Sequence, residues 1–138
     1  MTHLIEFNIK EIVLMLLLTF MSSSAMADWT QFANNRDKSM IVYVKLPKTI
    51  EPQYKVKMWV LFDYGSKQKF SNFEFKSIVN QIVFDCKNEL TSILYSAYYS
   101  KNMSEGNAVA INQNATQWIP NSPNSITEGL WKYSCGMD

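Results

Sequence analysis

Histidine is the scarcest chemically active residue in this sequence. It occurs once in 138 residues, as His3 near the amino terminus. That stretch has the features of a removable leader, so the processed chain is expected to contain no imidazole. Without imidazole a protein can form neither a Ser-His nor a Cys-His nucleophile pair, and it lacks the commonest neutral metal ligand. We therefore expect no enzymatic activity, no metal site and no cofactor.

Neither sign of charge is in excess. Lys and Arg number 13 against 12 Asp and Glu, which gives a formal net charge of +1 at pH 7. Removal of the leader takes away Lys10, Glu6 and Glu11 and leaves a net charge of about +2. This balance is not that of a polyanion-binding protein. The sequence therefore predicts that nucleic acid is not a partner.

The apolar run at the amino end is too short to cross a membrane. It extends over ten residues from Ile12 to Met21, whereas a spanning helix needs about 20. Three serines and then Ala25-Met26-Ala27 follow it. An apolar core before small residues is typical of a signal peptide with its cleavage site. We expect no stable membrane anchor once this leader is removed.

Cleavage is predicted between Ala27 and Asp28. Residues 1–27 are then the signal peptide, and residues 28–138 form a single domain of 111 residues, a size sufficient for one hydrophobic core. Met1 and Met15 are both candidate starts of translation.

Cysteine occurs only twice, as Cys86 and Cys135. Neither follows the cleavage site directly, so no thiol is available there for lipid attachment. We expect an exported protein, periplasmic or secreted, with display on the cell surface left open. An exported chain meets an oxidising compartment, and two cysteines allow one internal pairing. We predict a Cys86–Cys135 disulfide, worth roughly 4 kcal/mol for a loop of about 50 residues; two free or metal-binding thiols are the alternative.

Alternation with a period of two dominates the rest of the chain, as in half-buried strands. In the segment Tyr54–Asp63 it places one apolar set (Val56, Met58, Val60 and Phe62) opposite Lys55, Lys57 and Asp63. Further strands are expected in Trp29–Phe32, Met40–Lys45, Ile78–Cys86, Thr91–Ser100 and Ala108–Ile111.

Turn-forming residues separate these strands. They occur at Pro47-Lys48, Glu51-Pro52, Tyr64-Gly65-Ser66, Lys87-Asn88, Glu105-Gly106-Asn107 and Asn121-Ser122-Pro123. Such short connections favour antiparallel pairing, because parallel strands need long crossovers. We expect a meander of five or six strands.

The carboxyl end changes to a helical period. Ser125 and Glu128 have the spacing of a capping box. A helical wheel then groups Ile126, Leu130, Trp131, Tyr133 and Cys135 on one side and Glu128, Gly129 and Lys132 on the other. Cys86 is in phase with Ile82 and Phe84, which predicts that the helix packs on that sheet face and is linked to it by the disulfide. The predicted fold class is α+β.

Several sequence features occur in an order similar to that found in one known family. They are Trp29; Val56, Trp59 and Leu61 before Asp63-Tyr64; Lys76-Ser77 leading to Phe84-Asp85-Cys86; Tyr98-Tyr99-Ser100 with Met103 and Gly106; Trp118-Ile119-Pro120; and Ser125, Glu128, Leu130 and Cys135. With this set the chain resembles the bacterial surface-adhesin protein E family over nearly all of residues 28–138.

The resemblance implies a non-catalytic binding protein. For the best-known members it implies adhesion to host matrix and serum proteins, which are therefore the candidate partners. The family's adhesin is a lipoprotein, and this leader departs from it by having no cysteine at the cleavage point. A periplasmic structural or inhibitory accessory protein with one bacterial partner is the alternative.

Two groups of residues are candidates for the binding surface. Lys45, Lys48, Lys55 and Lys57 could form a basic patch around one hairpin, or simply a solvated strand face. Tyr95, Tyr98 and Tyr99, together with Tyr64, could form an aromatic platform, although tyrosines also pack across strands for stability.

Three further hypotheses concern hydrolysis, haem binding and glycosylation. Asp63, Glu74 and Asp85 could serve as acid and base in a hydrolase, but they are scattered along the chain. Met58 and the tyrosines could ligate haem, but no histidine accompanies them. The glycosylation patterns at Asn102 and Asn114 are interpreted as chance in a chain of bacterial type.

Overall fold

The computed structural model describes residues 8–13 and 28–137. Residues 9–13 are helical. In these two described ranges no helix has the length and apolar character needed to cross a bilayer. The predicted cleavage site lies at the edge of the second range, with Asp28 inside it and Ala27 outside.

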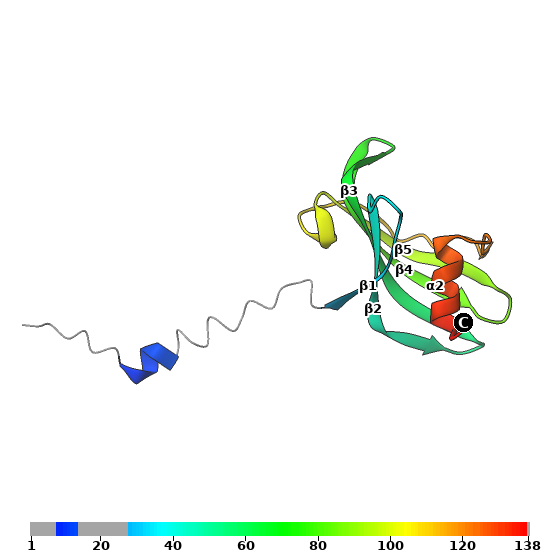
Figure 1. The fold of residues 1–138 in the computed structure, drawn as a ribbon, viewed down its shortest axis with the longest axis horizontal. Coiled ribbons are helices and arrows are strands. Elements are labelled where there is room, and N and C mark those ends of the chain that lie inside the picture. The colour runs from blue at the N-terminus through cyan, green and yellow to red at the C-terminus, as the bar shows by residue number, and fades with distance from the viewer. Residues whose placement is uncertain (1–7, 14–27, 138) are drawn as a thin grey trace, which may run out of the picture.

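One antiparallel sheet organises the domain (Figure 1). Its strands follow the chain in the order β1 (Trp29–Asn34), β2 (Met40–Glu51), β3 (Lys55–Phe70), β4 (Phe73–Asp85), β5 (Leu90–Tyr99) and β6 (Ala108–Asn112). A two-residue strand, β7 (Ile119–Pro120), pairs with the start of β5. The predicted α+β meander is confirmed, and β7 is an addition that the sequence pattern did not indicate.

Two predicted turns were wrong, because the chain continues through both as strand. Pro47-Lys48 lies inside β2, where the register with β3 shifts between Lys45 and Thr49. Tyr64-Gly65-Ser66 lies inside β3, where the register with β4 shifts before Gln68. Bulges admit a proline or a glycine without ending the strand. As a result β3 and β4 extend together into the long hairpin that projects from the sheet in Figure 1.

The carboxyl-terminal helix α2 (Ile126–Cys135) covers one face of the sheet, which we call the helix face. The core consists of side chains from this face and from the helix: Val42, Val44, Met58, Val60, Ile82, Phe84, Leu130 and Trp131. This arrangement confirms the predicted inward set of β3. Complete burial of a leucine or phenylalanine side chain is worth about 1.5–3 kcal/mol, so this layer is the main source of stability.

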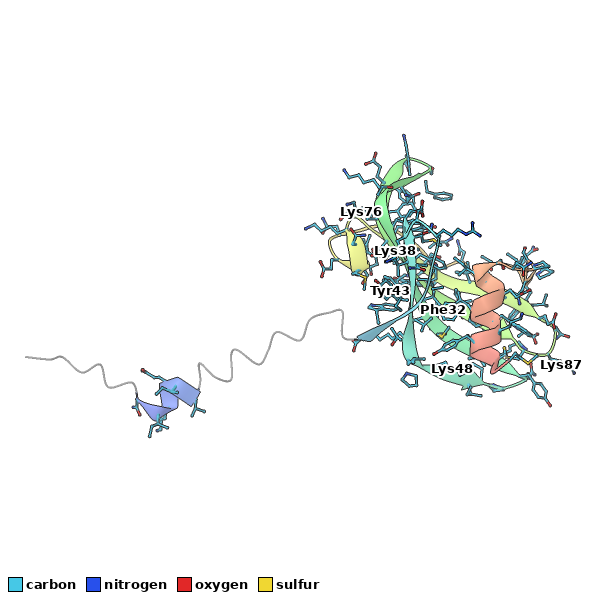
Figure 2. All side chains as sticks on the ribbon, in the orientation of Figure 1. Phe32, Lys38, Tyr43, Lys48, Lys76 and Lys87 are labelled. Atoms are coloured by element: carbon cyan, nitrogen blue, oxygen red, sulfur yellow. A yellow bond between two sulfur atoms is a disulfide. The ribbon has the colours of Figure 1, made fainter. Side chains whose placement is uncertain are left out.

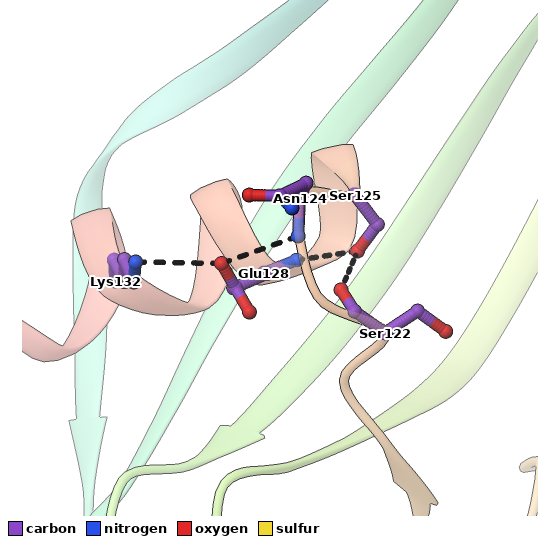
Figure 3. A network of polar contacts seen from close by, with 5 residues as sticks. All are labelled: Ser122, Asn124, Ser125, Glu128 and Lys132. Atoms are coloured by element: carbon purple, nitrogen blue, oxygen red, sulfur yellow. Dashed lines mark hydrogen bonds and ion pairs between the residues drawn. The ribbon is translucent and has the colours of Figure 1, made fainter.

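Polar contacts define the start of α2 (Figure 3). The Ser125 hydroxyl accepts a hydrogen bond from the Glu128 amide at 3.1 Å and donates to the Ser122 carbonyl at 2.6 Å. The Glu128 carboxylate accepts from the Asn124 amide at 3.4 Å and pairs with Lys132 at 3.3 Å. The predicted cap is therefore present, with the glutamate reaching one residue further back than in a standard capping box.

The other end of α2 is held covalently. Cys86 and Cys135 form the predicted disulfide, with their Cα atoms 5.5 Å apart, so the alternative of free thiols is wrong. The predicted apolar side of the helix needs one correction, because Tyr133 is 39% exposed whereas Ser134 is buried against Met58. The Trp131 indole donates to the Asp85 carbonyl at 2.8 Å, which joins the helix to the end of β4.

The opposite surface of the sheet, which we call the open face, has a much smaller cover. The short 3-10 helix η2 (Asn102–Ser104) lies on this side, away from α2 (Figure 1). Its Met103 packs on Leu61 and Val79. The Asp63 carboxylate accepts hydrogen bonds from the Met103 amide and the Asn102 side chain at 2.8 and 3.0 Å. No other helix among the described residues packs on the open face.

Candidate binding face

A single row of side chains crosses five strands on the open face. Strand pairing aligns Trp29 of β1 with Lys45 of β2, Lys45 with Trp59 of β3, Trp59 with Gln81 of β4, and Gln81 with Tyr95 of β5. Residues opposite one another in antiparallel strands project to the same side of the sheet. We call these five residues the cross-strand row.

The row forms a continuous surface of aromatic and amphipathic groups. The Lys45 Nζ lies 5.9 Å from the centre of the Trp29 ring, within cation–π range. Trp59 and Tyr95 meet edge to face at 5.7 Å. Trp29, Lys45, Trp59 and Val79 surround a shallow hollow of about 220 Å³. Trp59 remains 36% exposed at the centre of the row, which is unusual for a large aromatic side chain in the middle of a sheet.

The predicted lysine patch is only partly free for a partner. The Lys57 ammonium lies 3.2 Å from the Glu51 carboxylate, and Lys45 lies 3.9 Å from Asp28. Lys55 lies 5.8 Å from the centre of the Trp118 ring. These contacts place three of the four predicted lysines in a mixed aromatic and charged surface. The open face is therefore less basic than the lysine count alone indicates.

Lys48 has a structural position instead. Its ammonium donates to the carbonyl oxygens of Ser134 at 2.7 Å and Tyr133 at 3.2 Å (Figure 2 shows Lys48 beside the end of α2). A cation at the carboxyl end of a helix satisfies carbonyls that have no partner within the helix. Lys48 therefore holds α2 and lies apart from the row.

The predicted tyrosine platform is divided between the two faces. Tyr95 belongs to the cross-strand row, and Tyr99 packs at the margin of the cluster under Met103. Tyr98 lies on the helix face in edge-to-face contact with Phe73 and Phe75 at 5.1 Å each. Since neighbouring residues of a strand point to opposite sides, Tyr98 and Tyr99 cannot act on one ligand-binding face.

Tyr43 precedes Lys45 by two residues on β2 and pairs with Leu61, so it lies on the open face beside the row. Figure 2 labels Tyr43 on the side away from α2. Burial raises the pKa of its phenol, and the nearby negative charge of Asp63 raises it further. The phenol is therefore uncharged at neutral pH and contributes an aromatic surface with a hydrogen-bonding end.

Two of the three carboxylates considered as catalytic groups, Asp63 and Asp85, have structural contacts, whereas Glu74 is exposed on the projecting hairpin. Asp63 anchors η2. Burial raises the pKa of Asp85, but hydrogen bonds from Asn88 and Lys87 and the charge of Lys55 outweigh it, so the pKa is lowered. Within the described part of the chain, no group of three or more His, Cys, Asp or Glu residues could hold a metal ion.

Sequence reasoning missed the tryptophans as site residues. Trp29, Trp59 and Trp118 are named there chiefly as features of the family resemblance, although the alternation of Tyr54–Asp63 already places Trp59 on the same side as Lys55 and Lys57. The signal that could have found the row was the pairing of hairpins. Once the β2–β3 and β3–β4 turns are placed, the register puts Lys45, Trp59 and Gln81 side by side.

Comparisons with known proteins agree with this fold. A family model described as Surface-adhesin protein E matches residues 29–136. Crystal form II of Haemophilus influenzae protein E superposes with a TM-score of 0.62 at 11% sequence identity, covering 80% of this chain and 88% of that one. The selenomethionine form of the same protein gives a TM-score of 0.60 at 9% identity, over 80% of this chain and 87% of that chain. No curated protein matches the sequence.

Proposed function

This chain belongs to the surface-adhesin protein E family, and on that premise we propose that it is an exported, non-catalytic domain that binds a protein through the cross-strand row. Host matrix and serum proteins are the proposed partners. The protein is proposed to be exported, to the periplasm or out of the cell, through the signal peptide of residues 1–27, and binding to host proteins requires that it leave the periplasm. We propose that the protein binds its partner without a cofactor.

The observation that carries this proposal is the exposed aromatic row on the face that α2 leaves uncovered. Protein interfaces have cores that are rich in tryptophan, tyrosine and arginine, and a few such residues supply most of the binding energy. Trp29, Trp59 and Tyr95 are set in register on a rigid sheet. They would therefore lose little conformational freedom when a partner covers them.

The test is a variant at the centre of the row. Trp59→Ala should weaken binding to a matrix or serum protein that the wild type captures by at least tenfold, because it removes the central aromatic contact. The measurement is surface plasmon resonance against a panel of purified matrix and serum proteins. Tyr54→Ala is the matched control, because Tyr54 is 74% exposed in the β2–β3 turn and outside the row.

Two results would contradict the proposal. One is binding by the wild type no stronger than that of an unrelated exported protein. The other is equal affinity of Trp59→Ala and the wild type for a captured protein. The alternative, a periplasmic accessory protein with one bacterial partner, is separated by cell fractionation, because it requires that the protein be confined to the periplasm.

A further inference from the structure

A second hollow lies on the helix face, beside the first turn of α2. It has a volume of about 430 Å³. Its apolar lining comes from β3, β4, β5, β7 and the helix and includes Phe62, Ile78, Ile82, Ile93 and Leu130. Residues Thr116, Ile119, Pro120 and Ser122 and the start of α2 border it. Figure 3 shows Ser122 and Ser125 at that helix start. We call this hollow the helix-side groove.

Asn80 is the unexpected residue in this lining. It occupies an inward position of β4, between Ile78 and Ile82 and opposite Val60, and it is only 6% exposed. The Asn80 Oδ1 accepts a hydrogen bond from the Ser96 hydroxyl at 2.6 Å. The Asn80 Nδ2 has no acceptor among residues 8–13 and 28–137. The Asn80 Nδ2 is not among the fully buried unpaired atoms of the described residues, so it is open to the groove that Asn80 lines. This donor can therefore pair with an acceptor that a ligand supplies.

The groove has no charge to offer a ligand. Among the described residues that line it, none is Asp, Glu, Lys or Arg, and the polar ones are amide, hydroxyl or phenol groups. Burial raises the pKa of Tyr64 at its margin, and the neighbouring Tyr98 adds to the increase, so the Tyr64 phenol is uncharged at neutral pH. An ionic ligand would lose its hydration there without compensation. The lining therefore favours an uncharged ligand.

The size of the groove favours a small molecule. Its volume lies within the range of about 300–1,000 Å³ that is typical of small-molecule sites. A stable protein interface instead buries about 800 Å² on each partner, which is a larger and flatter surface than this one. The groove also lies on the opposite side of the sheet from the cross-strand row, so a ligand in it would leave the row free.

We propose that the helix-side groove binds an uncharged, largely apolar small molecule with an acceptor atom that receives a hydrogen bond from the Asn80 Nδ2. The apolar part of the ligand rests on Phe62, Ile78 and Ile82. This site is independent of the protein-binding function proposed above.

The experiment uses three amphiphiles with the same eight-carbon chain. Octyl glucoside is neutral, octanoate is negative and octyltrimethylammonium is positive. Each is titrated, below its critical micelle concentration, into ¹⁵N- and methyl-labelled protein. The protein is used in the form in which the producing cells export it. Octyl glucoside should shift the Asn80 side-chain amide and the methyl groups of Ile78 and Ile82 in a saturable way. Its affinity should exceed that of either charged probe by about tenfold or more.

Variants assign the effect to the amide. Asn80→Leu should weaken octyl glucoside binding about tenfold, and the double variant Asn80→Leu/Ser96→Ala should do the same without leaving the Ser96 hydroxyl unpaired. Asn34→Leu, an exposed position of β1, should bind like the wild type. Unchanged melting temperatures would show that the variants fold.

Several results would overturn the inference. These are equal affinity for the charged probes, shifts that map to the cross-strand row, and unchanged affinity of both Asn80 variants. Shifts of the groove that depend on protein concentration in the absence of any probe would also overturn it, because they would identify a second copy of the chain as the occupant.

Discussion

At the scale of single residues, two carboxylates, the buried Asp85 and the half-buried Asp63, hold loops against the sheet. Asp85 is 5% exposed at the end of β4, and its two carboxylate oxygens accept hydrogen bonds from the Lys87 amide, the Asn88 amide and the Asn88 side chain, each at 3.0 Å. Cys86 lies within this turn, so the carboxylate also fixes the strand end to which the disulfide attaches. Asp63 has the same role for η2. Each side chain organises a turn that carries no regular hydrogen-bond ladder of its own.

Asp85→Asn should lower stability at neutral pH and flatten its pH dependence. The pKa of Asp85 is lowered in the folded state. Its stabilisation is therefore present above the ordinary carboxyl pKa of 3.8 and is lost as the pH falls through the lower folded value. We expect a loss of about 1 kcal/mol, or several degrees in melting temperature, at pH 7 and a smaller loss near pH 3.

The measurement for Asp85 is thermal unfolding followed by circular dichroism between pH 3 and pH 7. Glu74→Gln serves as the control, because Glu74 is an exposed residue of the projecting hairpin. The same decrease for Asp85→Asn at both ends of the pH range would mean that the charge of Asp85 contributes nothing to folding.

At the scale of secondary-structure elements, α2 is secured at three places. Its start is capped by Ser125, its middle joins β4 through the Trp131 indole, and its last turn is tied by Cys135 and by Lys48. A helix of 10 residues would be marginal in isolation. Its persistence therefore depends on these tertiary contacts.

Replacing both cysteines by serine tests the covalent contact. Cys86→Ser/Cys135→Ser should lower the free energy of unfolding by up to about 4 kcal/mol, because the disulfide no longer restricts the unfolded chain. Amide hydrogen exchange in α2 should rise more than in β3, since the helix end loses its attachment. Lys48→Met, which removes only the ammonium contact, should give a much smaller change. An unchanged melting temperature of the double variant would mean that the disulfide does not stabilise the fold.

The elements that sequence predicts well are those with one local cause. Alternation identified the inward face of β3, and the serine and glutamate spacing identified the start of α2. The bulges at Pro47 and Gly65 were mistaken for turns, because the same residues occur in both and only pairing with neighbouring strands decides between them. Likewise, β7 pairs with β5 although irregular chain separates β7 from β6. No local sequence pattern predicts such a long-range pairing.

The candidate site was harder to predict than the fold. Lys45, Lys55, Lys57 and Tyr95 do share the open face, but Lys48 and Tyr98 lie elsewhere. A one-residue difference in position reverses the side of the sheet to which a side chain points. The bulge in β2 before Thr49 and the contact of Lys48 with α2 are both tertiary features, so counting lysines could not reveal them.

At the scale of the whole molecule, the sheet separates two environments. The helix face contains the core, α2 and the helix-side groove, whereas the open face presents the cross-strand row. The predicted processed chain would begin at Asp28, next to Trp29 and within 3.9 Å of Lys45. Cleavage there would place the new terminal amine at the margin of the row.

Mass spectrometry of the exported protein should find Asp28 as its first residue. The intact mass should also be two hydrogens below that of the dithiol form, because the disulfide is present. A different first residue, a lipid-modified terminus or a mass equal to that of the dithiol would contradict this prediction. Unprocessed protein, obtained by blocking the signal peptidase, provides the mass reference.

The cross-strand row has one member on each of five strands, so a short peptide cannot reproduce it. With about 4.8 Å between neighbouring strands, its ends lie roughly 19 Å apart, although Trp29 and Tyr95 are distant in the sequence. A linear peptide copied from any one strand carries a single member of the row. The surface is therefore a discontinuous epitope that comes into being only when the meander has assembled.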